Sequence, residues 1–428
     1  MTYKPVRQAL AGGRVKKTSR SHQKRKRKAA PPPAATSAAL KRLQRPSIER
    51  VCSKCFEDEN LVGWIEQQDG EPGCDACGKR DAPTADLNEL ADHMRERLER
   101  YYGYAADQLP YDSGEGGYLA PHWDTYDLLA DVVGLSLPRD SRGLFFRLCE
   151  AISDQMWCEY DWLTLDLDDS LASGWGRFSK VVQHQRRFFF HEFGIDRDDP
   201  DQRSPAELLR FIGKLAERQS LIKSLPRGTR IYRARHLDPM PAKVCAKDLG
   251  PPPAKYALQS NRMNPAGIPM LYAATHPRTA LHEVRGKGAV LGTFEVMRDA
   301  RILDLSLLPP VPGIFSNSSR EDRLGLKFLI EFERSITKPV ARDQRVHVDY
   351  LPSQVATEFF REFAFASGPI DGIQYRSSLD KSGSNIVLFA TVRDIKGWRP
   401  ARGPWARLVK ASPWLRLVDV RLPARRVR

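Results

Sequence analysis

The chain has 428 residues, of which 41% are hydrophobic and 28% are charged, a composition typical of globular proteins. A single core tends to stop growing near about 250–300 residues, so this length favours two or three domains. No apolar run approaches the roughly eighteen residues that a membrane span needs, and the N-terminus shows no hydrophobic signal segment. These features argue against a membrane protein, and we expect a cytoplasmic location.

The net charge of +15 is concentrated at the two ends of the chain. Residues 1–50 carry fifteen Lys or Arg against one acidic residue, and residues 399–428 carry nine against one. The part between these ends is therefore mildly acidic. Basic tails attract polyanions mainly through counterion release and without sequence recognition. We expect weak nucleic-acid contact through the tails at most.

The first half of the chain divides into three predicted parts. Residues 1–46 mix charge with Ala, Pro and Ser and are predicted to form a disordered basic tail. Residues 47–85 hold four of the seven cysteines, and residues 86–222 show apolar residues at helical spacing. The last helix predicted within 86–222 begins at Ser204, which is followed by a proline and a capping-box glutamate. We therefore expect an all-helical domain over 86–222.

After residue 222 the apolar pattern becomes typical of strands. Short β-type runs separated by loops and two amphipathic helices predict an α+β domain over 223–398, followed by a basic C-terminal tail over 399–428. The predicted strands are 231–235, 290–296, 302–305, 346–350 and 386–389.

Two CxxC pairs, Cys52 with Cys55 and Cys74 with Cys77, are separated by eighteen residues. Two residues between thiolates allow one tight turn to present both sulfurs to a tetrahedral ion, so this spacing predicts a small zinc ribbon. Four thiolates leave no coordination position for water, which indicates a structural zinc. Disulfides and unliganded cysteines are the alternatives.

Three stretches of the α+β region carry residues suited to chemistry. The first is Arg230–Arg235, where strand alternation places Arg233 and Arg235 on one face. The second bears Arg262 on a Gly/Pro-rich loop, then Tyr272 on a short strand. It ends in a helix that opens near Thr275 and Pro277, with Ala280, Leu281 and Val284 as its expected buried stripe and Glu283 at the margin of that stripe.

The third stretch is a loop that bears Ser377 and Ser378 and leads through Asn385 into a buried strand. Together these motifs, in this order over about 220–395, resemble the RES domain, a family named for its Arg, Glu and Ser. The matching segments read RIYRAR, NRMNPAGIPMLYAA, TALHEV, SQVATEFF and DGIQYRSS…SNIVLF. The resemblance implies a fold like that of ADP-ribosyltransferases and a toxin that destroys NAD by hydrolysis or phosphorolysis.

The resemblance also implies roles for individual residues. Cleavage of the nicotinamide–ribose bond builds oxocarbenium charge, which Glu283 would stabilise. Arg262 and Arg233 would bind the pyrophosphate, and Tyr272 would stack on nicotinamide. Ser377, or Ser378 as second choice, would hydrogen-bond the ribose or the carboxamide, and Asn385 is a further expected NAD-binding residue. An antitoxin or other inhibitory protein is an expected partner of such a toxin.

Two other functions stay open at this point. The helical region resembles the HEPN-like segment found ahead of some RES domains, and Arg186 with His191 matches the spacing of HEPN ribonucleases. A zinc-containing nucleic-acid-binding protein without enzymatic activity is the second alternative. The sequence leaves open whether water or phosphate is the acceptor, and it does not define the oligomeric state.

Overall fold

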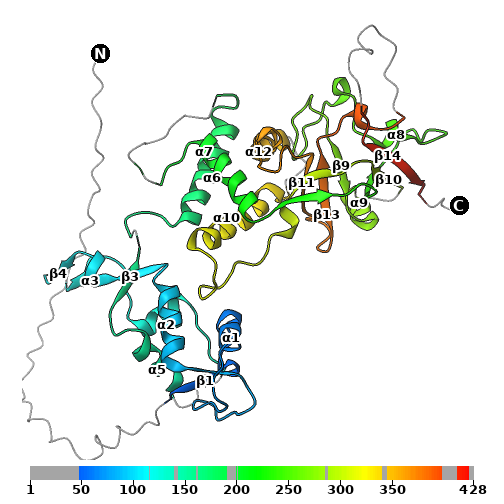
Figure 1. Cartoon of the computed structure of the whole chain (residues 1–428). Coiled ribbons are helices and arrows are strands. Elements are labelled where there is room, and N and C mark those ends of the chain that lie inside the picture. Colours follow the sequence, from blue (N-terminus) through cyan, green and yellow to red (C-terminus); the bar gives the residue numbers. More distant parts are fainter. Residues whose placement is uncertain are drawn as a thin grey trace, which may run out of the picture. The chain divides into compact units, whose positions relative to one another are not determined.

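A computed structural model describes residues 48–114, 116–138, 143–160, 162–189, 199, 201–284, 288–339, 345–397 and 412–423. The described residues from Ile48 onward belong to one compact unit. The predicted tail over 1–46 lies outside the described residues. Figure 1 labels the main elements along the chain.

The N-terminal part combines a two-stranded sheet with helices. Strand β1 (Arg50–Cys52) pairs antiparallel with β2 (Thr84–Asp86), which brings the two ends of the cysteine segment together. The helices α1 (Glu59–Ile65), α2 (Leu87–Leu98) and α5 (Leu144–Ile152) enclose one buried core. The helical spacing of apolar residues predicted after residue 86 is confirmed in α2, where Leu87, Leu90, Met94 and Leu98 are all buried and the helix packs against α5.

The prediction that 86–222 is all-helical is wrong in detail. Two short antiparallel pairs lie within it, namely β3 (Tyr102–Tyr104) with β6 (Trp157–Glu159), and β4 (Tyr111–Asp112) with β5 (Gly117–Tyr118). Aromatic side chains favour such pairs, and the ring of fully buried Trp157 lies 4.8 Å from that of Tyr104. Short helical turns complete this part: η2 (Ser53–Cys55), α3 (Ala105–Gln108), α4 (Thr125–Asp127) and η3 (Leu128–Val132).

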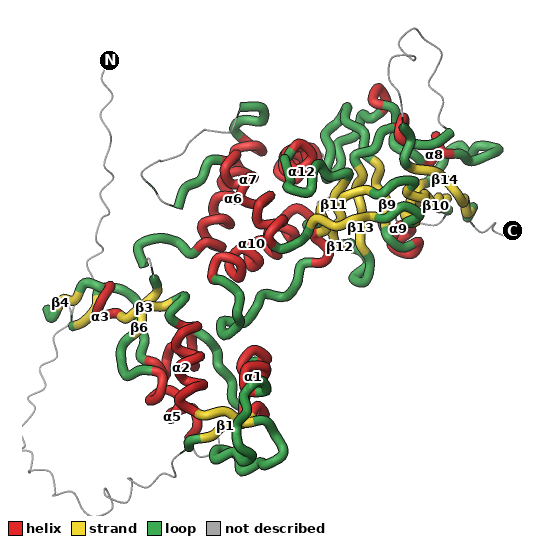
Figure 2. Tube along the Cα trace, viewed as in Figure 1, coloured by secondary structure: helices red, strands yellow, loops and turns green. Residues whose placement is uncertain are grey.

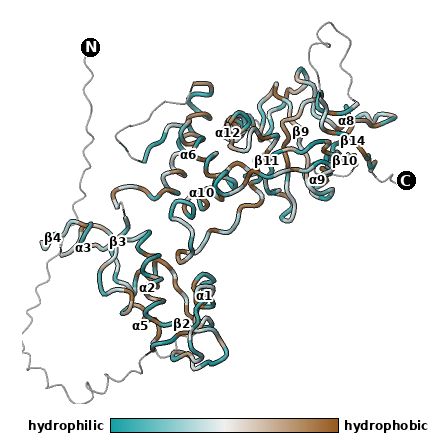
Figure 3. The backbone as a smooth tube through the Cα atoms, in the orientation of Figure 1, coloured by the Kyte–Doolittle hydropathy of each residue, from teal (hydrophilic) through white to brown (hydrophobic). Residues whose placement is uncertain are grey.

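Four longer helices gather into a bundle (Figure 1): α6 (Leu167–His184), α7 (Pro205–Arg218), α10 (Arg320–Thr337) and α12 (Leu351–Glu362). The capping box predicted at Ser204 is confirmed, with both of its hydrogen bonds present. Each helix mixes hydrophobic and hydrophilic residues (Figure 3) and turns its apolar residues inward. Helices α6 and α7 thus share a core with helices of the α+β region, although a domain boundary is predicted at 222.

The α+β region is built on one eight-stranded sheet in the order β14-β10-β8-β9-β13-β12-β11-β7. Figure 2 shows strands of this sheet in yellow. Neighbouring strands are antiparallel except β11 and β12, which are parallel. Strands β8 and β9 pair at a single position, Tyr232 with Ala274. The two halves of the sheet are therefore linked there by a single β-bridge. The strands are β7 (Ile222–Leu225), β8 (Arg230–Arg235), β9 (Leu271–Ala274), β10 (Val290–Val296), β11 (Ala300–Asp304), β12 (Gly372–Arg376), β13 (Ser384–Leu388) and β14 (Leu415–Arg421).

The α+β prediction is confirmed, and the strands predicted at 231–235, 290–296, 302–305 and 386–389 correspond to β8, β10, β11 and β13. The prediction for 346–350 is wrong, because residues 346–349 form the short helix α11 (Val346–Asp349) although valine favours strands. Residues 371–378, predicted as a loop, contain β12. Part of the predicted tail 399–428 is β14, which pairs with β10 at the sheet edge.

Shorter elements complete the region: α8 (Ala246–Leu249), η5 (Ala254–Tyr256), α9 (Pro277–Val284), η6 (Leu305–Leu307) and η7 (Val392–Asp394). The predicted helix start near Pro277 and the predicted strand around Tyr272 are both confirmed. Among the described helices, none has the length and apolar character needed to cross a lipid bilayer.

Candidate functional site

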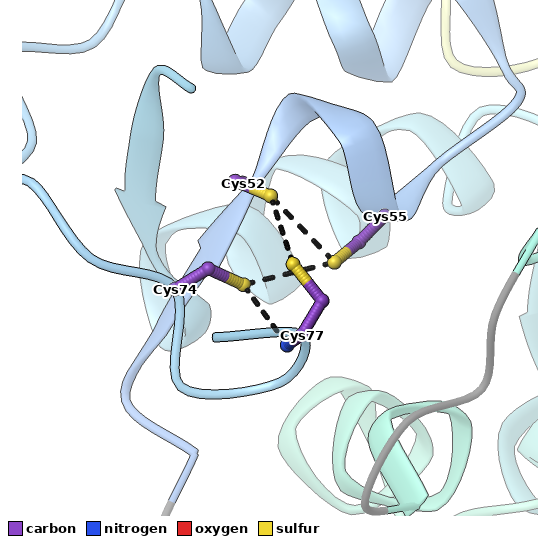
Figure 4. Close-up of side chains that lie close together, drawn as sticks. All are labelled: Cys52, Cys55, Cys74 and Cys77. Atoms are coloured by element: carbon purple, nitrogen blue, oxygen red, sulfur yellow. Dashed lines mark hydrogen bonds between the residues drawn. The ribbon is translucent and has the colours of Figure 1, made fainter. Parts of the chain in front are cut away.

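The four cysteines of the CxxC pairs lie together, as predicted (Figure 4). Their sulfur atoms are 3.8 Å apart for Cys52 and Cys55, 3.7 Å for Cys55 and Cys74, and 3.5 Å for Cys52 and Cys77. A disulfide requires about 2.05 Å between sulfurs, so these thiols are not bonded to one another. Four sulfurs about 2.3 Å from a tetrahedral zinc ion would lie roughly 3.8 Å apart, which fits this cluster.

The electrostatics of the cluster also suit a divalent cation. Burial, together with the neighbouring thiols, raises the pKa of Cys52 to about 11, whereas the hydrogen bond from Cys55 lowers the pKa of Cys74 to about 4. The sulfurs therefore cannot all ionise at neutral pH unless a cation compensates their charge. The turn that bears Cys74 and Cys77 is flanked by Gly73 and Gly78, whose positive φ angles of 119° and 74° favour glycine.

The second cluster centres on Glu283, in the last turn of α9. Its Oε1 accepts a hydrogen bond from Ser377 Oγ at 2.7 Å and another from Asn385 Nδ2 at 2.7 Å. Ser377 follows β12, and Asn385 lies on β13 in register with Tyr375. Pairing of these two strands thus brings both donors to one carboxylate oxygen.

Ser377 is itself held by the loop that it begins. Its Oγ accepts hydrogen bonds from the backbone N–H of Leu379 at 3.2 Å and of Asp380 at 3.1 Å. With its lone pairs engaged by these donors, the hydroxyl proton is directed at Glu283. The side chain is buried, with 7% of its surface exposed. Ser377 therefore holds the carboxylate, and its contact with the ribose or carboxamide stays a prediction.

A buried polar contact joins α9 to the same loop. Thr279 Oγ1 donates to Asp380 Oδ2 at 2.8 Å, and Thr279 is fully buried one turn before Glu283. A Cβ at Gly383 would lie 2.1 Å from Thr279 Oγ1, so only glycine allows this approach. The expected buried stripe of α9 is therefore partly wrong: Thr279 faces inward, and Leu281 is 41% exposed.

Arg262 is fixed at the C-terminal end of α10. Its Nη1 donates to the carbonyl oxygens of Ile336 at 3.0 Å and Lys338 at 2.7 Å, acceptors that the helix end leaves without intrahelical partners. Its Cζ lies 5.4 Å from the ring centroid of Tyr350. The guanidinium is held in place although its side chain is only partly buried.

Tyr272 ties β9 to the loop that carries Arg262. Its hydroxyl donates to Asn264 Oδ1 at 2.6 Å and accepts from the backbone N–H of Met263 at 3.0 Å. Burial, followed by the nearby Tyr375, raises the pKa of the Tyr272 phenol, so it stays neutral. Because the protein engages its hydroxyl, Tyr272 offers a ligand mainly its ring.

These groups surround a cleft of about 750 Å³, a size common for small-molecule sites. Of the predicted site residues, Arg262, Tyr272, Glu283 and Ser378 line the cleft, and Ser377 and Asn385 hold Glu283. The other lining residues are Gln259, Ser260, Asn261, Pro339, Val346, His347, Tyr350, Tyr375 and Leu379.

Arg233 is a predicted site residue that neither lines this cleft nor hydrogen-bonds Glu283. Its neighbour Ala234 packs on the side of the sheet covered by α9, and strand alternation directs Arg233 away from that side. Burial and the nearby Arg235 lower the pKa of Arg233 to about 10. Among the described residues, its buried Nη1 has no hydrogen-bond partner.

The sequence interpretation missed two aromatic residues of the cleft. Tyr375 is buried opposite Asn385, a position that strand alternation from Ile373 would have indicated had β12 been recognised. Tyr350 follows α11, in the stretch predicted as a strand, and no pattern in the sequence pointed to its contact with Arg262.

The fold and the cleft define an α+β domain that holds one carboxylate between donors from two strands, next to a fixed guanidinium. Comparison with protein families finds two matches. Residues 230–407 match the RES domain, and residues 67–195 match the HEPN/RES N-terminal domain 1. The chain is therefore a RES-domain protein with a HEPN-like N-terminal region. Searches of curated proteins and of solved structures found no match.

The RES family is associated with NAD-related toxin activity. The motif that suggested a HEPN ribonuclease is only partly visible, because Arg186 is exposed beyond the end of α6 and His191 lies outside the described residues.

Proposed function

We propose that this protein degrades NAD by cleaving the bond between nicotinamide and ribose, as a toxin or defence effector. The observation that carries the proposal is the Glu283 carboxylate, which lies in the cleft with Oε1 engaged by Ser377 and Asn385. Fixed carboxylates next to a cleft that can hold a nucleotide suit a reaction in which positive charge develops on the sugar.

In this reaction the glycosidic bond breaks, nicotinamide leaves with the bonding electron pair, and the ribose becomes an oxocarbenium ion. Glu283 stabilises that ion through its second carboxylate oxygen, because Oε1 is already bound by two donors. The donors also keep the side chain from rotating, so little reorganisation is needed as charge develops. Water completes hydrolysis, or phosphate completes phosphorolysis, at the same ribose carbon.

The other cleft residues bind and orient the dinucleotide. Arg262 contacts the pyrophosphate, because a guanidinium fixed through one nitrogen still has further N–H donors for phosphate oxygens. The rings of Tyr272 and Tyr375 form an apolar surface for nicotinamide. Ser378 is exposed at the cleft and hydrogen-bonds the ribose or carboxamide.

Arg233 has a less direct part in this proposal. It supplies positive charge behind the cleft and attracts the anionic substrate. The four cysteines bind a structural zinc ion, and an antitoxin or other inhibitory protein restrains the activity in the cell.

The test is to incubate the full chain with NAD, with and without phosphate, and to identify the products by chromatography. Free nicotinamide with ADP-ribose indicates hydrolysis, and a phosphorylated ADP-ribose product indicates phosphorolysis. We expect Glu283→Ala to lower turnover by about 10²–10⁴-fold while leaving the thermal unfolding unchanged. The matched control is Glu331→Ala, which removes an exposed carboxylate of α10.

Absence of NAD loss by the wild type, or full turnover by Glu283→Ala, would contradict the proposal. Cut RNA in a parallel incubation would instead support the ribonuclease alternative. Shifted but uncut RNA would support a nucleic-acid-binding protein.

A further inference from the structure

A second cavity of about 420 Å³ adjoins the cleft. The two cavities share three lining residues, Arg262, Pro339 and Tyr350. Arg262 thus stands at the junction, with Glu283 on one side only. The opposite side of the second cavity is formed by α6, which contributes Trp175, Ser179 and Gln183.

The lining of this second cavity combines rings and uncharged polar groups with four charged residues, Arg262, Lys338, Arg345 and Asp349. Trp175 forms a rigid wall, since it is 6% exposed and its indole N–H donates to Ser335 Oγ at 2.9 Å. Tyr350 is partly exposed, and its ring already faces the Arg262 guanidinium. Gln183 is partly exposed on α6, and within the described residues no hydrogen bond engages its side chain.

We propose that the second cavity binds the adenosine half of NAD, an inference that rests on the proposed function. If nicotinamide and its ribose lie at Glu283 and the pyrophosphate lies at Arg262, the rest of the dinucleotide extends past Arg262. The cavity beyond Arg262 offers aromatic surface on which a purine stacks. The carboxamide of Gln183 presents one donor and one acceptor, the pattern that complements N7 and the N6 amine of adenine.

This proposal gives the N-terminal region a part in substrate recognition. Helix α6 belongs to the segment that matches the HEPN/RES N-terminal domain, whereas Glu283 and Arg262 belong to the RES match. The helix is held against α10 and α12 by buried aromatic contacts, including Trp175 with Phe332 at 4.9 Å between ring centroids. The adenosine site is therefore built by both matched regions.

The test is calorimetric titration of the full chain with AMP, which requires no turnover. We expect Ser179→Trp to abolish AMP binding, because the indole fills the cavity. We expect Gln183→Ala to weaken binding by about three- to tenfold, the value of one net hydrogen bond. Ser173→Trp and Gln185→Ala are the matched controls, since both residues are exposed outside the cavity and should leave AMP affinity unchanged.

A second measurement compares NAD with nicotinamide mononucleotide, which lacks adenosine, as competitors for the cleft. Gln183→Ala should raise the KM for NAD and leave competition by the mononucleotide unchanged. Unchanged AMP affinity in both cavity variants, or no AMP binding by the wild type, would overturn the adenosine site. Failure of the wild type to consume NAD would contradict the proposed function and leave the AMP result interpretable by itself.

Discussion

The cysteine cluster and the Glu283 cleft are assembled in opposite ways. The cysteines come from two short turns that a single strand pair, β1 with β2, brings together. The groups around Glu283 come from separate elements, since Ser377 and Asn385 lie 94 and 102 residues away in the chain. A spacing motif can specify the first kind of site by itself, whereas the second kind depends on the order of strands in a sheet.

Removal of the metal should affect the two sites very differently. We expect a strong chelator, or Cys55→Ser, to unfold the N-terminal part, because structural zinc contributes on the order of 10 kcal/mol in small zinc domains. Zinc content and circular dichroism measure the loss. Exposed Asp69→Asn is a control outside the cluster. Protein that is purified without zinc and is fully folded would contradict this prediction, because the N-terminal part would then fold without a metal ion.

The donors to Glu283 should matter for turnover more than for stability. We expect Ser377→Ala to lower kcat by about tenfold to a hundredfold, because the carboxylate loses one fixed donor and can rotate. Asn385→Ala should have a similar effect, and the double variant should lose less than the product of both, since both donors serve one oxygen. Multiplicative losses would show that the two donors act independently.

The contact between α9 and the loop that begins at Ser377 should have a smaller, indirect effect on turnover. Thr279→Val keeps the side-chain shape but removes the hydroxyl that donates to Asp380. We expect kcat to fall by about tenfold or less with KM for NAD unchanged, whereas Thr279→Ser should retain most activity. If Thr279→Val keeps full activity and Thr279→Ser loses it, the methyl group and not the hydrogen bond is what α9 requires.

The smallest predicted effect is a pH dependence in the N-terminal part. Burial, followed by Arg97, lowers the pKa of His93 to about 4, and its ring stacks on Trp64 at 4.7 Å. The unfolded chain binds the proton near pH 6.5 but the folded chain does not, so stability is highest above pH 6.5 and falls as the pH drops toward 4.

His93→Phe keeps the stacked ring and removes the titration. We expect the variant to lose less stability than the wild type between pH 7 and pH 5, by on the order of 1 kcal/mol or less because the ring is partly exposed to water. Thermal unfolding of both proteins measures this difference, and the shared cysteine cluster cancels in the comparison. If the stability of the two proteins changes with pH in the same way, His93 is not the source of the pH dependence.

Much of this architecture could be predicted from local patterns. The capping box at Ser204, the strand at 290–296 and the cysteine spacing depend on neighbouring residues, and the structure confirms each. The prediction for 346–350 was wrong because two alternating valines are a short signal and the β preference of valine depends on its context. Strand β14 was not predicted because the basic charge of its segment suggested a tail.

The candidate site was only partly accessible from sequence. Family resemblance indicated Glu283, Arg262 and Tyr272, and these residues do share one cleft. The sequence could not show that Ser377 faces Glu283, since that contact depends on the register of β12 with β13. Nor could it show that Arg233 is directed away from the cleft, because the face of β8 is set by its pairing with β10.

The two hydrogen bonds that Glu283 Oε1 accepts also require a side chain of the length of glutamate. Helix α9 fixes the backbone of the residue, while Ser377 just after β12 and Asn385 on β13 fix the position of its terminal oxygen. An aspartate at this position would stop about 1.5 Å short, one carbon–carbon bond, and would lose both donors even though its charge is the same. Glutamate is thus selected here by reach as well as by acidity.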